Sequence, residues 1–355
     1  MIFKQFFITR LAAVGLMSIT LMGCVAPVSK QFSFDDRAIE QEAKKQRIMA
    51  LENRLGMISK IQTLSYPILQ ANADLCEDRV TKTLGLYFTS LHDFDKSLTA
   101  AGKEIGYSGR IQISEIIQGG PAHLAGLRVG DRILSINEKA IPPTKKARNI
   151  VTKTLRAAES HDIKLAVKRG NERLFVQAEA VDSCDYPVFL GESSEINAFA
   201  TGDSIVIQKG MISFAQQDLE LRLVIAHELA HNMMGHIEAS TINHLGGVLL
   251  DSVLIVVSGI DFGARHIAMD AYSQEFEAEA DYVGIYLLER AGFDSTGSAD
   301  FWRKMGASGE ANIKGHHTHS HPATPYRFLA IKKASEEVRI KKAQGLPLIP
   351  DLKEE

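Results

Sequence analysis

Residues 223–231 read Leu-Val-Ile-Ala-His-Glu-Leu-Ala-His, and this stretch determines how the rest of the chain is interpreted. Residues four apart on a helix lie on one face, so the imidazoles of His227 and His231 can bind one metal ion. Glu228 would then lie beside a water molecule on that ion instead of binding the ion itself. The apolar residues 223–226 indicate a buried helix, in which two unpaired histidines and a glutamate would be energetically costly. The stretch therefore predicts a metal site on a buried helix.

A zinc site that performs hydrolysis needs three protein ligands and one open position. Residues 272–290 are expected to form a helix that carries Glu277 and Asp281 four residues apart. The same face carries the small residues Ala280 and Gly284, which would let this helix approach the helix of the two histidines. The sequence thus favours a distant carboxylate from this helix as the third ligand.

Other polar residues near these helices are interpreted differently. His236 follows Gly235, but it lies one residue away from the position of the third histidine in metzincins. Glu275 and Glu279 share a helix face with the bulky Tyr282 and Tyr286, and this face is expected to be solvated. We therefore do not expect any of these residues to bind the metal.

Four segments together resemble the M48 family of zinc metallopeptidases. They are Asn-Ala-Phe-Ala at 197–200, His-Glu-Leu-Ala-His at 227–231, Glu-x-x-Ala-Asp at 277–281 and His-Pro-x-x-x-x-Arg at 321–327. The resemblance implies peptide-bond hydrolysis with one Zn²⁺ per chain. It also implies the following roles: zinc ligands His227, His231 and Glu277, general base Glu228, and supporting residues Asp281 and Arg327.

The resemblance also places His321 close to the metal. His321 would either donate a hydrogen bond to the developing oxyanion or occupy the open zinc position as a gate. The other histidines of the same stretch, His316, His317 and His319, are expected to lie in a polar loop.

Residues 81–180 contain short apolar segments punctuated by glycine, at 84–88, 109–117, 131–137 and 162–169, which predict strands. In Gly-Gly-Pro-Ala-His-Leu-Ala-Gly-Leu-Arg-Val-Gly-Asp at 119–131, Pro121 can open a short helix that Gly126 closes. This arrangement resembles a PDZ domain. Such domains bind extended C-terminal peptides by strand addition. The carboxylate-binding stretch would be Leu84, Gly85 and Leu86. The domain could instead serve only to dock against the rest of the protein.

The first residues have the layout of a secretory signal peptide, with Lys4 and Arg10 preceding an apolar run that ends at Cys24. Leu-Met-Gly-Cys at 21–24 resembles the lipobox of bacterial lipoproteins, in which the cysteine carries the lipid. Val25 in place of aspartate resembles sorting to the outer membrane. We therefore expect a lipid-anchored protein of the bacterial periplasm. A retained N-terminal anchor is the alternative.

Export would leave Cys76 and Cys184 in an oxidising compartment, so a disulfide between them is expected. Two buried free thiols are the alternative. The 40 Lys and Arg residues nearly balance the 43 Asp and Glu residues, and no long basic run occurs, which argues against nucleic acid as a partner. No oligomeric state follows from the sequence.

Two further segments concern helices. Residues 35–62 predict an amphipathic helix that ends at Tyr66-Pro67 and serves either as a spacer or as a strut packed on the catalytic domain. The apolar segment 244–260 is short for a membrane span and contains Asp251. Because it lies between His231 and Glu277, a single crossing would put ligands of one ion on opposite sides of a bilayer. A buried helix or a surface hairpin is therefore expected.

These observations predict an α+β protein: a mainly helical, zincin-like metallopeptidase domain with a small sheet, preceded by a β-rich PDZ domain and an N-terminal amphipathic helix. The expected function is zinc-dependent cleavage of protein or peptide substrates in the cell envelope, with a role in protein quality control. The alternative is a chaperone or adaptor lipoprotein that binds envelope proteins through its PDZ domain and seldom cuts. The expected boundaries are signal peptide 1–23, anchor and helix 24–73, PDZ domain 74–184, metallopeptidase domain 185–346 and polar tail 347–355.

Overall fold

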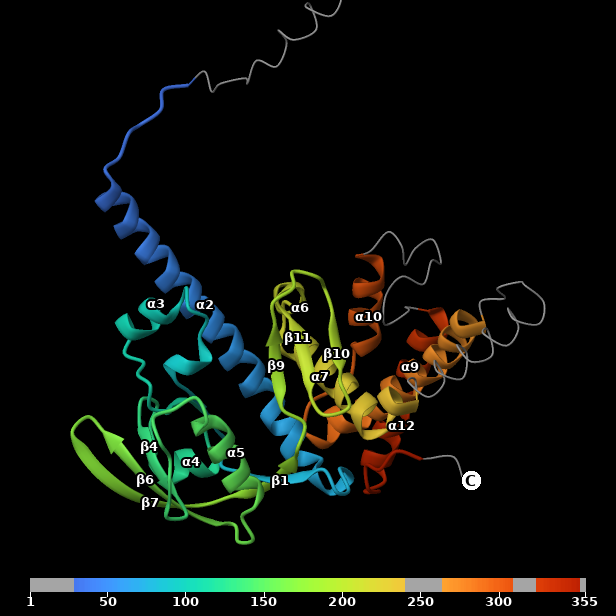
Figure 1. Ribbon diagram of the computed structural model, residues 1–355. Coiled ribbons are helices and arrows are strands. Elements are labelled where there is room, and N and C mark those ends of the chain that lie inside the picture. The colour runs from blue at the N-terminus through green and yellow to red at the C-terminus, as the bar shows by residue number, and fades with distance from the viewer. Residues whose placement is uncertain (1–28, 240–263, 309–323, 352–355) are drawn as a thin grey trace, which may run out of the picture. The chain divides into compact units, whose positions relative to one another are not determined.

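The computed structural model describes residues 29–239, 264–308 and 324–351 (Figure 1). Two compact units are distinguished, Met1–Lys45 and Gln46–Glu355. In the first, residues 29–45 are exposed chain followed by the beginning of the long helix α2. The helices are α2 (Asp36–Ala71), α3 (Thr99–Glu104), α4 (Pro121–Leu124), α5 (Ala147–Arg156), α6 (Lys209–Phe214), α7 (Asp218–Met233), α9 (Ala264–Arg290), α10 (Ser298–Ala307) and α12 (Pro325–Ala343), with 3₁₀ turns at Ala73–Leu75 and Leu91–Asp93.

The strands are β1 (Val80–Thr83), β2 (Leu86–Thr89), β3 (Gln112–Ile116), β4 (Arg132–Ile136), β5 (Lys139–Ala140), β6 (Asp162–Arg169), β7 (Glu172–Glu179), β8 (Val181–Cys184), β9 (Val188–Gly191), β10 (Ala198–Ala200) and β11 (Ile205–Gln208). A β-rich region therefore precedes a mainly helical region with a small sheet. This confirms the fold class expected from the sequence.

Helix α2 continues past Pro67, so the expected end of the helix at Tyr66-Pro67 is wrong. A proline inside a helix removes one hydrogen bond and costs about 3 kcal/mol. Beyond the proline, Ile68 and Leu69 are buried in the core, and each such side chain contributes about 1.5–3 kcal/mol. Together they offset the cost of the proline.

The C-terminal part of α2 packs into the same hydrophobic core as α7, α9, α10 and α12, which we call the helical core. Ile61 and Leu64 contribute to this core in addition to the residues beyond Pro67. The strut alternative is therefore the one that the structure supports for this part of the helix. Helix α2 also contacts the β-rich region, because the hydroxyl of Tyr87 donates to the carbonyl of Gln62 at 3.1 Å.

The β-rich region is built on a six-stranded antiparallel sheet with the order β2-β3-β4-β6-β7, in which β5 also pairs with β4. In Figure 1, α4 and α5 lie beside this sheet. Its hydrophobic core is separate from the helical core. The four strands predicted from the sequence correspond to β2, β3, β4 and β6, and Pro121 opens α4 as predicted. Gly126 has a positive φ, as expected for a glycine that closes this helix, and so does Gly130, which with Asp131 has the sequence of a turn.

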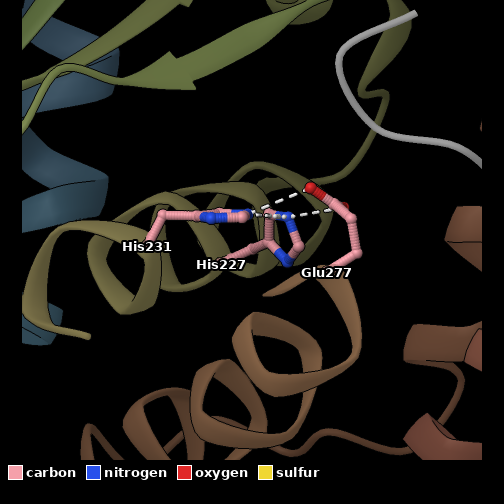
Figure 2. A group of neighbouring side chains, drawn as sticks. All are labelled: His227, His231 and Glu277. Carbon is pink, nitrogen blue, oxygen red and sulfur yellow. Dashed lines mark hydrogen bonds and ion pairs between the residues drawn. The ribbon is translucent and has the colours of Figure 1, made fainter. Parts of the chain in front are cut away.

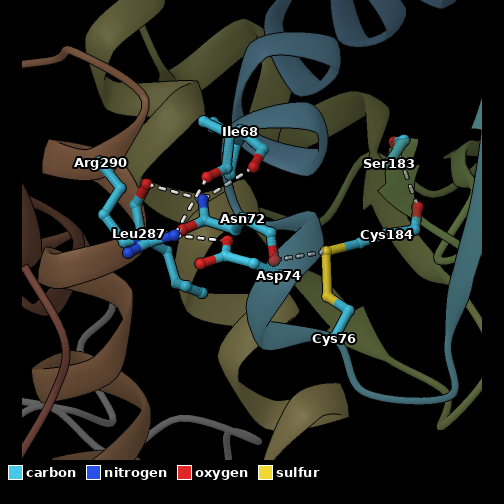
Figure 3. The surroundings of a disulfide bond; sticks show 9 residues. Ile68, Asn72, Asp74, Cys76, Ser183, Cys184, Leu287 and Arg290 are labelled. Atoms are coloured by element: carbon cyan, nitrogen blue, oxygen red, sulfur yellow. Dashed lines mark hydrogen bonds and ion pairs between the residues drawn. A yellow bond between two sulfur atoms is a disulfide. The ribbon is translucent and has the colours of Figure 1, made fainter. Parts of the chain in front are cut away.

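Strands β1 and β8 pair antiparallel where the chain enters and leaves this region. Cys184, the last residue of β8, forms a disulfide with Cys76 at a sequence separation of 108 (Figure 3). Both cysteines are buried and belong to the helical core. The expected pairing is therefore present in the structure.

The small sheet has the order β10-β11-β9, with β10 antiparallel and β9 parallel to the central strand β11. In the sequence, Gly202-Asp203 between two apolar segments predicts a turn, and this turn joins β10 and β11, with a φ of 87° at Gly202. The side chain of Asn232 accepts from the Gly202 amide at 2.7 Å and donates to the Ser204 carbonyl at 2.9 Å. These bonds tie this turn to the end of α7.

In the sequence, Ser213 followed three residues later by Gln216 has the pattern of a capping box and predicts a helix start at Ser213, but α7 does not begin there. The capping box is formed by Gln217 and Glu220, and a separate short helix, α6, precedes it. The Glu220 carboxylate accepts from the amides of Gln216 and Gln217 and is also bonded to Lys304 of α10. A tertiary ion pair therefore helps to select this helix start. Among the described residues, no helix is long and apolar enough to cross a bilayer.

Candidate metal centre

Helix α7 brings His227 and His231 onto one buried face, as the spacing predicts. Their side chains are 1% and 8% exposed, and their Nε2 atoms are 3.1 Å apart. The indole of Trp302 lies against His227, with ring centroids 4.9 Å apart. The sequence interpretation did not include Trp302, because it comes from α10, which packs here through tertiary contacts.

Helix α9 brings the carboxylate of Glu277 to the same point (Figure 2). Its Oε2 lies 3.4 Å from Nε2 of His227, and its Oε1 lies 3.2 Å from Nε2 of His231. The two helices approach closely because of Gly284, where an added Cβ would lie 3.2 Å from both Cα and N of His227. Ala280 is fully buried on the same helix. The small residues therefore act as their positions in the sequence suggested.

These three side chains have the geometry of a metal site. Zn–N distances of 2.0–2.1 Å in a tetrahedral site place neighbouring ligand atoms about 3.3 Å apart. The separations of 3.1–3.4 Å match this value. Among the described residues, these three buried side chains form a group in which one ligand atom of each lies within 4.8 Å of the others.

The charge of the surroundings also fits a divalent cation. The carboxylates of Glu228, Glu277 and Asp281 are buried, and so is the guanidinium of Arg327. When all are ionised, these groups leave two formal negative charges in the protein interior. A net charge in the protein interior is strongly unfavourable, so a dication would compensate it.

Asp281 lies behind His227 and in contact with Arg327. Its Oδ1 is 3.1 Å from Nδ1 of His227, and its two oxygens accept from Nε and Nη2 of Arg327 at 2.7 and 2.8 Å. Nη1 of Arg327 lies 2.8 Å from Glu277. Burial alone would raise the pKa of Asp281, but the adjacent guanidinium outweighs it and lowers that pKa. Asp281 therefore stays ionised and can hold the His227 ring.

The two histidines differ in their affinity for a proton. Burial alone would lower the pKa of His227, but hydrogen bonds with Asp281 and Glu277 outweigh it and raise this pKa to about 10. Burial lowers the pKa of His231, and the hydrogen bond with Glu277 only partly opposes it. Without a metal ion, the carboxylates of Asp281 and Glu277 therefore favour a positive charge beside them. A proton on His227 can supply this charge.

His236 and Glu279 form an additional contact that the sequence interpretation missed. Nδ1 of His236 lies 3.0 Å from Nδ1 of His231, and its Nε2 lies 2.8 Å from Oε2 of Glu279. The expectation of a merely solvated Glu279 is therefore wrong, although its side chain is 44% exposed. Tyr286, expected on that solvated face, is fully buried and donates to Glu337 of α12. Glu275 is exposed, as expected.

In the β-rich region, Leu84 and Leu86 are buried, and Gly85 between them has a φ of 63°. The aromatic ring of Tyr66 from α2 packs on Gly85, where an added Cβ would lie 3.2 Å from a ring carbon. The carbonyls of Leu84 and Gly85 accept from the amides of Ala122 and Ile117, which fixes the loop in place.

Several predicted features lie outside the described residues. They are the signal peptide and Cys24, the apolar segment 244–260, His316, His317, His319 and His321.

Fold and site together define a metallopeptidase domain that follows a PDZ domain. The sequence model of Peptidase family M48 matches residues 164–335, and the model of the PDZ domain matches residues 112–169. The chain therefore carries an M48 peptidase domain. Residues 164–169, which both matches include, are part of β6 in the six-stranded sheet.

Curated relatives are similar to this chain over part of their length. The beta-barrel assembly-enhancing protease of Escherichia coli K12 is 29% identical over 150 residues, which are 38% of this chain and 30% of that protein. The mitochondrial metalloendopeptidase OMA1 of Arabidopsis thaliana is 24% identical over 172 residues, 47% of this chain and 35% of that protein. The chain thus spans about a third of the length of these relatives. A crystal structure of the HtrA3 PDZ domain bound to a phage-derived ligand matches 29% of this chain and 88% of that one, with 20% identity and a TM-score of 0.23.

Proposed function

We propose that the chain is a zinc-dependent endopeptidase of the bacterial cell envelope. The observation that carries this proposal is the convergence of His227, His231 and Glu277 at the separations of a tetrahedral site. Two imidazoles, one carboxylate and an open position are the ligand set of catalytic zinc in several hydrolases. The similarity to proteases and metalloendopeptidases supports the same reaction.

The residues of the chain would divide the work of peptide-bond hydrolysis. A zinc ion held by His227, His231 and Glu277 would supply Lewis-acid chemistry, polarising the scissile carbonyl and making a water molecule more acidic. Glu228, which follows the ligand His227 and is buried, takes the proton of the attacking water and passes it to the leaving amine. Asp281 and Arg327 keep the His227 and Glu277 side chains in orientation. His321 would act as an oxyanion donor or a gate.

The PDZ domain, with proposed boundaries 74–184, would bind a substrate or partner peptide ahead of the peptidase domain 185–346. Within the described part of the chain, β2 pairs only with β3, so it forms the edge of the sheet to which an extended peptide can add. The backbone of Leu84, Gly85 and Leu86 leads into this strand and would hold a terminal carboxylate. Binding of peptides with a free carboxylate but not of the same peptides amidated, measured by fluorescence anisotropy, tests this assignment.

We also propose that Cys24 carries a lipid. This lipid would hold the protein to the outer membrane, facing the periplasm. A role in envelope protein quality control is consistent with the name of the Escherichia coli relative. In cell fractionation, Cys24→Ser should move the protein from the membrane to the soluble fraction. Membrane attachment that persists in this variant would contradict the anchor.

The experiment for the enzymatic proposal is Glu228→Gln in the purified protein. Zinc content should stay near one ion per chain while cleavage of an unfolded protein substrate is abolished, because Glu228 acts as base and not as ligand. Glu275→Gln is the matched control, since Glu275 is an exposed glutamate on α9, and it should keep wild-type activity. Cleavage by Glu228→Gln at the wild-type rate would contradict the role of Glu228 as base, whereas a wild-type protein that cuts no substrate would favour the adaptor alternative.

A further inference from the structure

His236 is held by three contacts beside the candidate metal centre. Its ring is 3% exposed and stacks on Phe276 of α9, with ring centroids 4.5 Å apart and an interplanar angle of 15°. Nδ1 faces Nδ1 of His231, and Nε2 faces the carboxylate of Glu279. Both ring nitrogens therefore have partners, and one partner is a candidate zinc ligand.

The local backbone explains how His236 reaches this place. Helix α7 ends at Met233, and Gly235 takes a φ of 65° immediately before His236. A left-handed glycine after the last helical turn reverses the chain direction. The turn carries the His236 ring back over His231, so the rings meet although five positions along a helix would not bring them together.

The hydrogen bonds that link His231, His236 and Glu279 can run in only one direction when Glu279 is ionised. An ionised carboxylate only accepts, so Nε2 of His236 must donate to it. A neutral imidazole that donates from one nitrogen accepts at the other, so Nδ1 of His236 accepts from Nδ1–H of His231. Nε2 of His231 then carries a lone pair, and this is the atom that faces His227 and Glu277.

We propose that His236 and Glu279 are positioning residues that fix the tautomer and the ring orientation of His231 for metal binding. The proposal rests on the proposed function, because it assigns His231 as a zinc ligand. Without Glu279, His236 can carry its proton on Nδ1 instead, and His231 would then be protonated on Nε2, which blocks the metal position. Ligand histidines in metalloproteins commonly donate their second N–H to such a partner.

The other candidate ligand on α7 has an equivalent partner. Nδ1 of His227 faces Asp281, which is fully buried and held by Arg327. The arrangement at His231 differs, because the His236 imidazole lies between the ligand and the carboxylate. In addition, the side chain of Glu279 is 44% exposed. Glu279 can therefore be substituted without introducing a cavity into the core.

The test measures zinc affinity of the metal-free full chain by competition with a chromophoric chelator. His236→Phe keeps the stacking on Phe276 and removes both hydrogen bonds, and it should weaken zinc binding about 10- to 100-fold. His236→Asn, whose amide oxygen can replace Nδ1 as acceptor, should recover part of this loss. Glu279→Ala should weaken binding in the same direction, while the exposed Glu275→Ala on the same helix should have no effect.

A second measurement separates positioning from a general loss of structure. In the cobalt-substituted protein, the visible d–d absorption reports the coordination geometry, and it should change in His236→Phe while the far-UV circular dichroism stays that of the wild type. If His236→Phe does not fold, Glu279→Ala carries the test alone. A variant that folds and binds zinc with wild-type affinity and an unchanged cobalt spectrum overturns the proposal.

The final experiment combines His236→Phe with Glu279→Ala. If Glu279 acts only through His236, then Glu279→Ala should have no further effect on zinc affinity in the His236→Phe background. If the losses of zinc affinity were additive, His236 and Glu279 would act independently. This result would overturn the proposal that Glu279 acts on His231 through His236. Failure of the wild type to bind zinc would refute the proposed function itself. Equal zinc binding by wild type and His236→Phe would refute only the positioning role.

Discussion

Arg327 lies between two buried carboxylates and carries the positive charge that they share. It makes a two-point contact with Asp281 and a third contact with Glu277, and its own side chain is 4% exposed. Burial alone would lower the pKa of this guanidinium, but Asp281 and Glu277 outweigh it and raise the pKa further above its ordinary value. The residue thus makes it possible to bury this acidic site before any metal is bound.

We expect Arg327→Met to lower the free energy of unfolding of the metal-free protein by about 3–5 kcal/mol, because it leaves buried carboxylates without their partner. The loss should be smaller in the presence of zinc, since a dication replaces part of the missing charge. Urea denaturation with a chelator and with excess zinc measures both values.

Arg339→Met is the matched control, because Arg339 lies on the same helix α12 and pairs with Glu336 on an exposed surface. It should leave the free energy of unfolding close to that of the wild type, because an exposed ion pair of this kind contributes little. A metal-free Arg327→Met protein as stable as this control would contradict the role of Arg327.

The contact of α7 with α9 sets the distance between the two histidines and Glu277. Gly284 is a point of close approach, since an added Cβ there would lie 3.2 Å from backbone atoms of His227. The candidate ligands come from two different helices, so their separation depends on the distance between these helices. The identity of one small residue therefore affects the geometry of the candidate ligands.

We expect Gly284→Ala to reduce peptidase activity by less than the roughly 100-fold that a displacement of about 1 Å at a reacting centre causes, because contacts at 3.2 Å require smaller shifts than that. The added methyl group meets backbone and not a flexible side chain, and such overpacking costs about 1–3 kcal/mol. Steady-state kinetics together with thermal denaturation measures both effects.

Gly56→Ala in α2 provides the comparison, since nothing lies within 4 Å of the added methyl group. It should stabilise the helix by about 0.5–1 kcal/mol and leave activity unchanged. If Gly284→Ala behaves like Gly56→Ala, the close approach does not control the site.

Local patterns in the sequence predicted many of these elements, and long-range contacts account for what they missed. The spacing of His227 and His231, the helix opened by Pro121 and the turn at Gly202 all follow from neighbouring residues. The contact of His236 with Glu279 joins positions 43 residues apart, and no local periodicity reports it. Likewise, Pro67 stays inside a helix because tertiary burial compensates for its local cost.

The six-stranded sheet is inserted in the sequence between α2 and the remaining elements of the helical core. The disulfide between Cys76 and Cys184 closes this insertion at its base. Asn72, near the end of α2, donates to the carbonyl of Leu287 on α9 at 3.0 Å and accepts from Arg290 at 2.9 Å (Figure 3). The base of the insertion therefore contacts the C-terminal end of the helix that carries Glu277.

We expect the double variant Cys76→Ala and Cys184→Ala to lose about 4–5 kcal/mol of unfolding free energy, because the disulfide closes a loop of about 100 residues in the unfolded chain. The single tryptophan, Trp302, is buried in the helical core, and its fluorescence reports the unfolding of that core in urea. Because both cysteines belong to the same core, the fluorescence transition should shift to lower urea. A reductant should shift the wild type in the same direction and leave the variant unchanged. Two titratable thiols in the native oxidised protein, or a Trp302 transition that the substitutions do not move, would contradict this role of the disulfide.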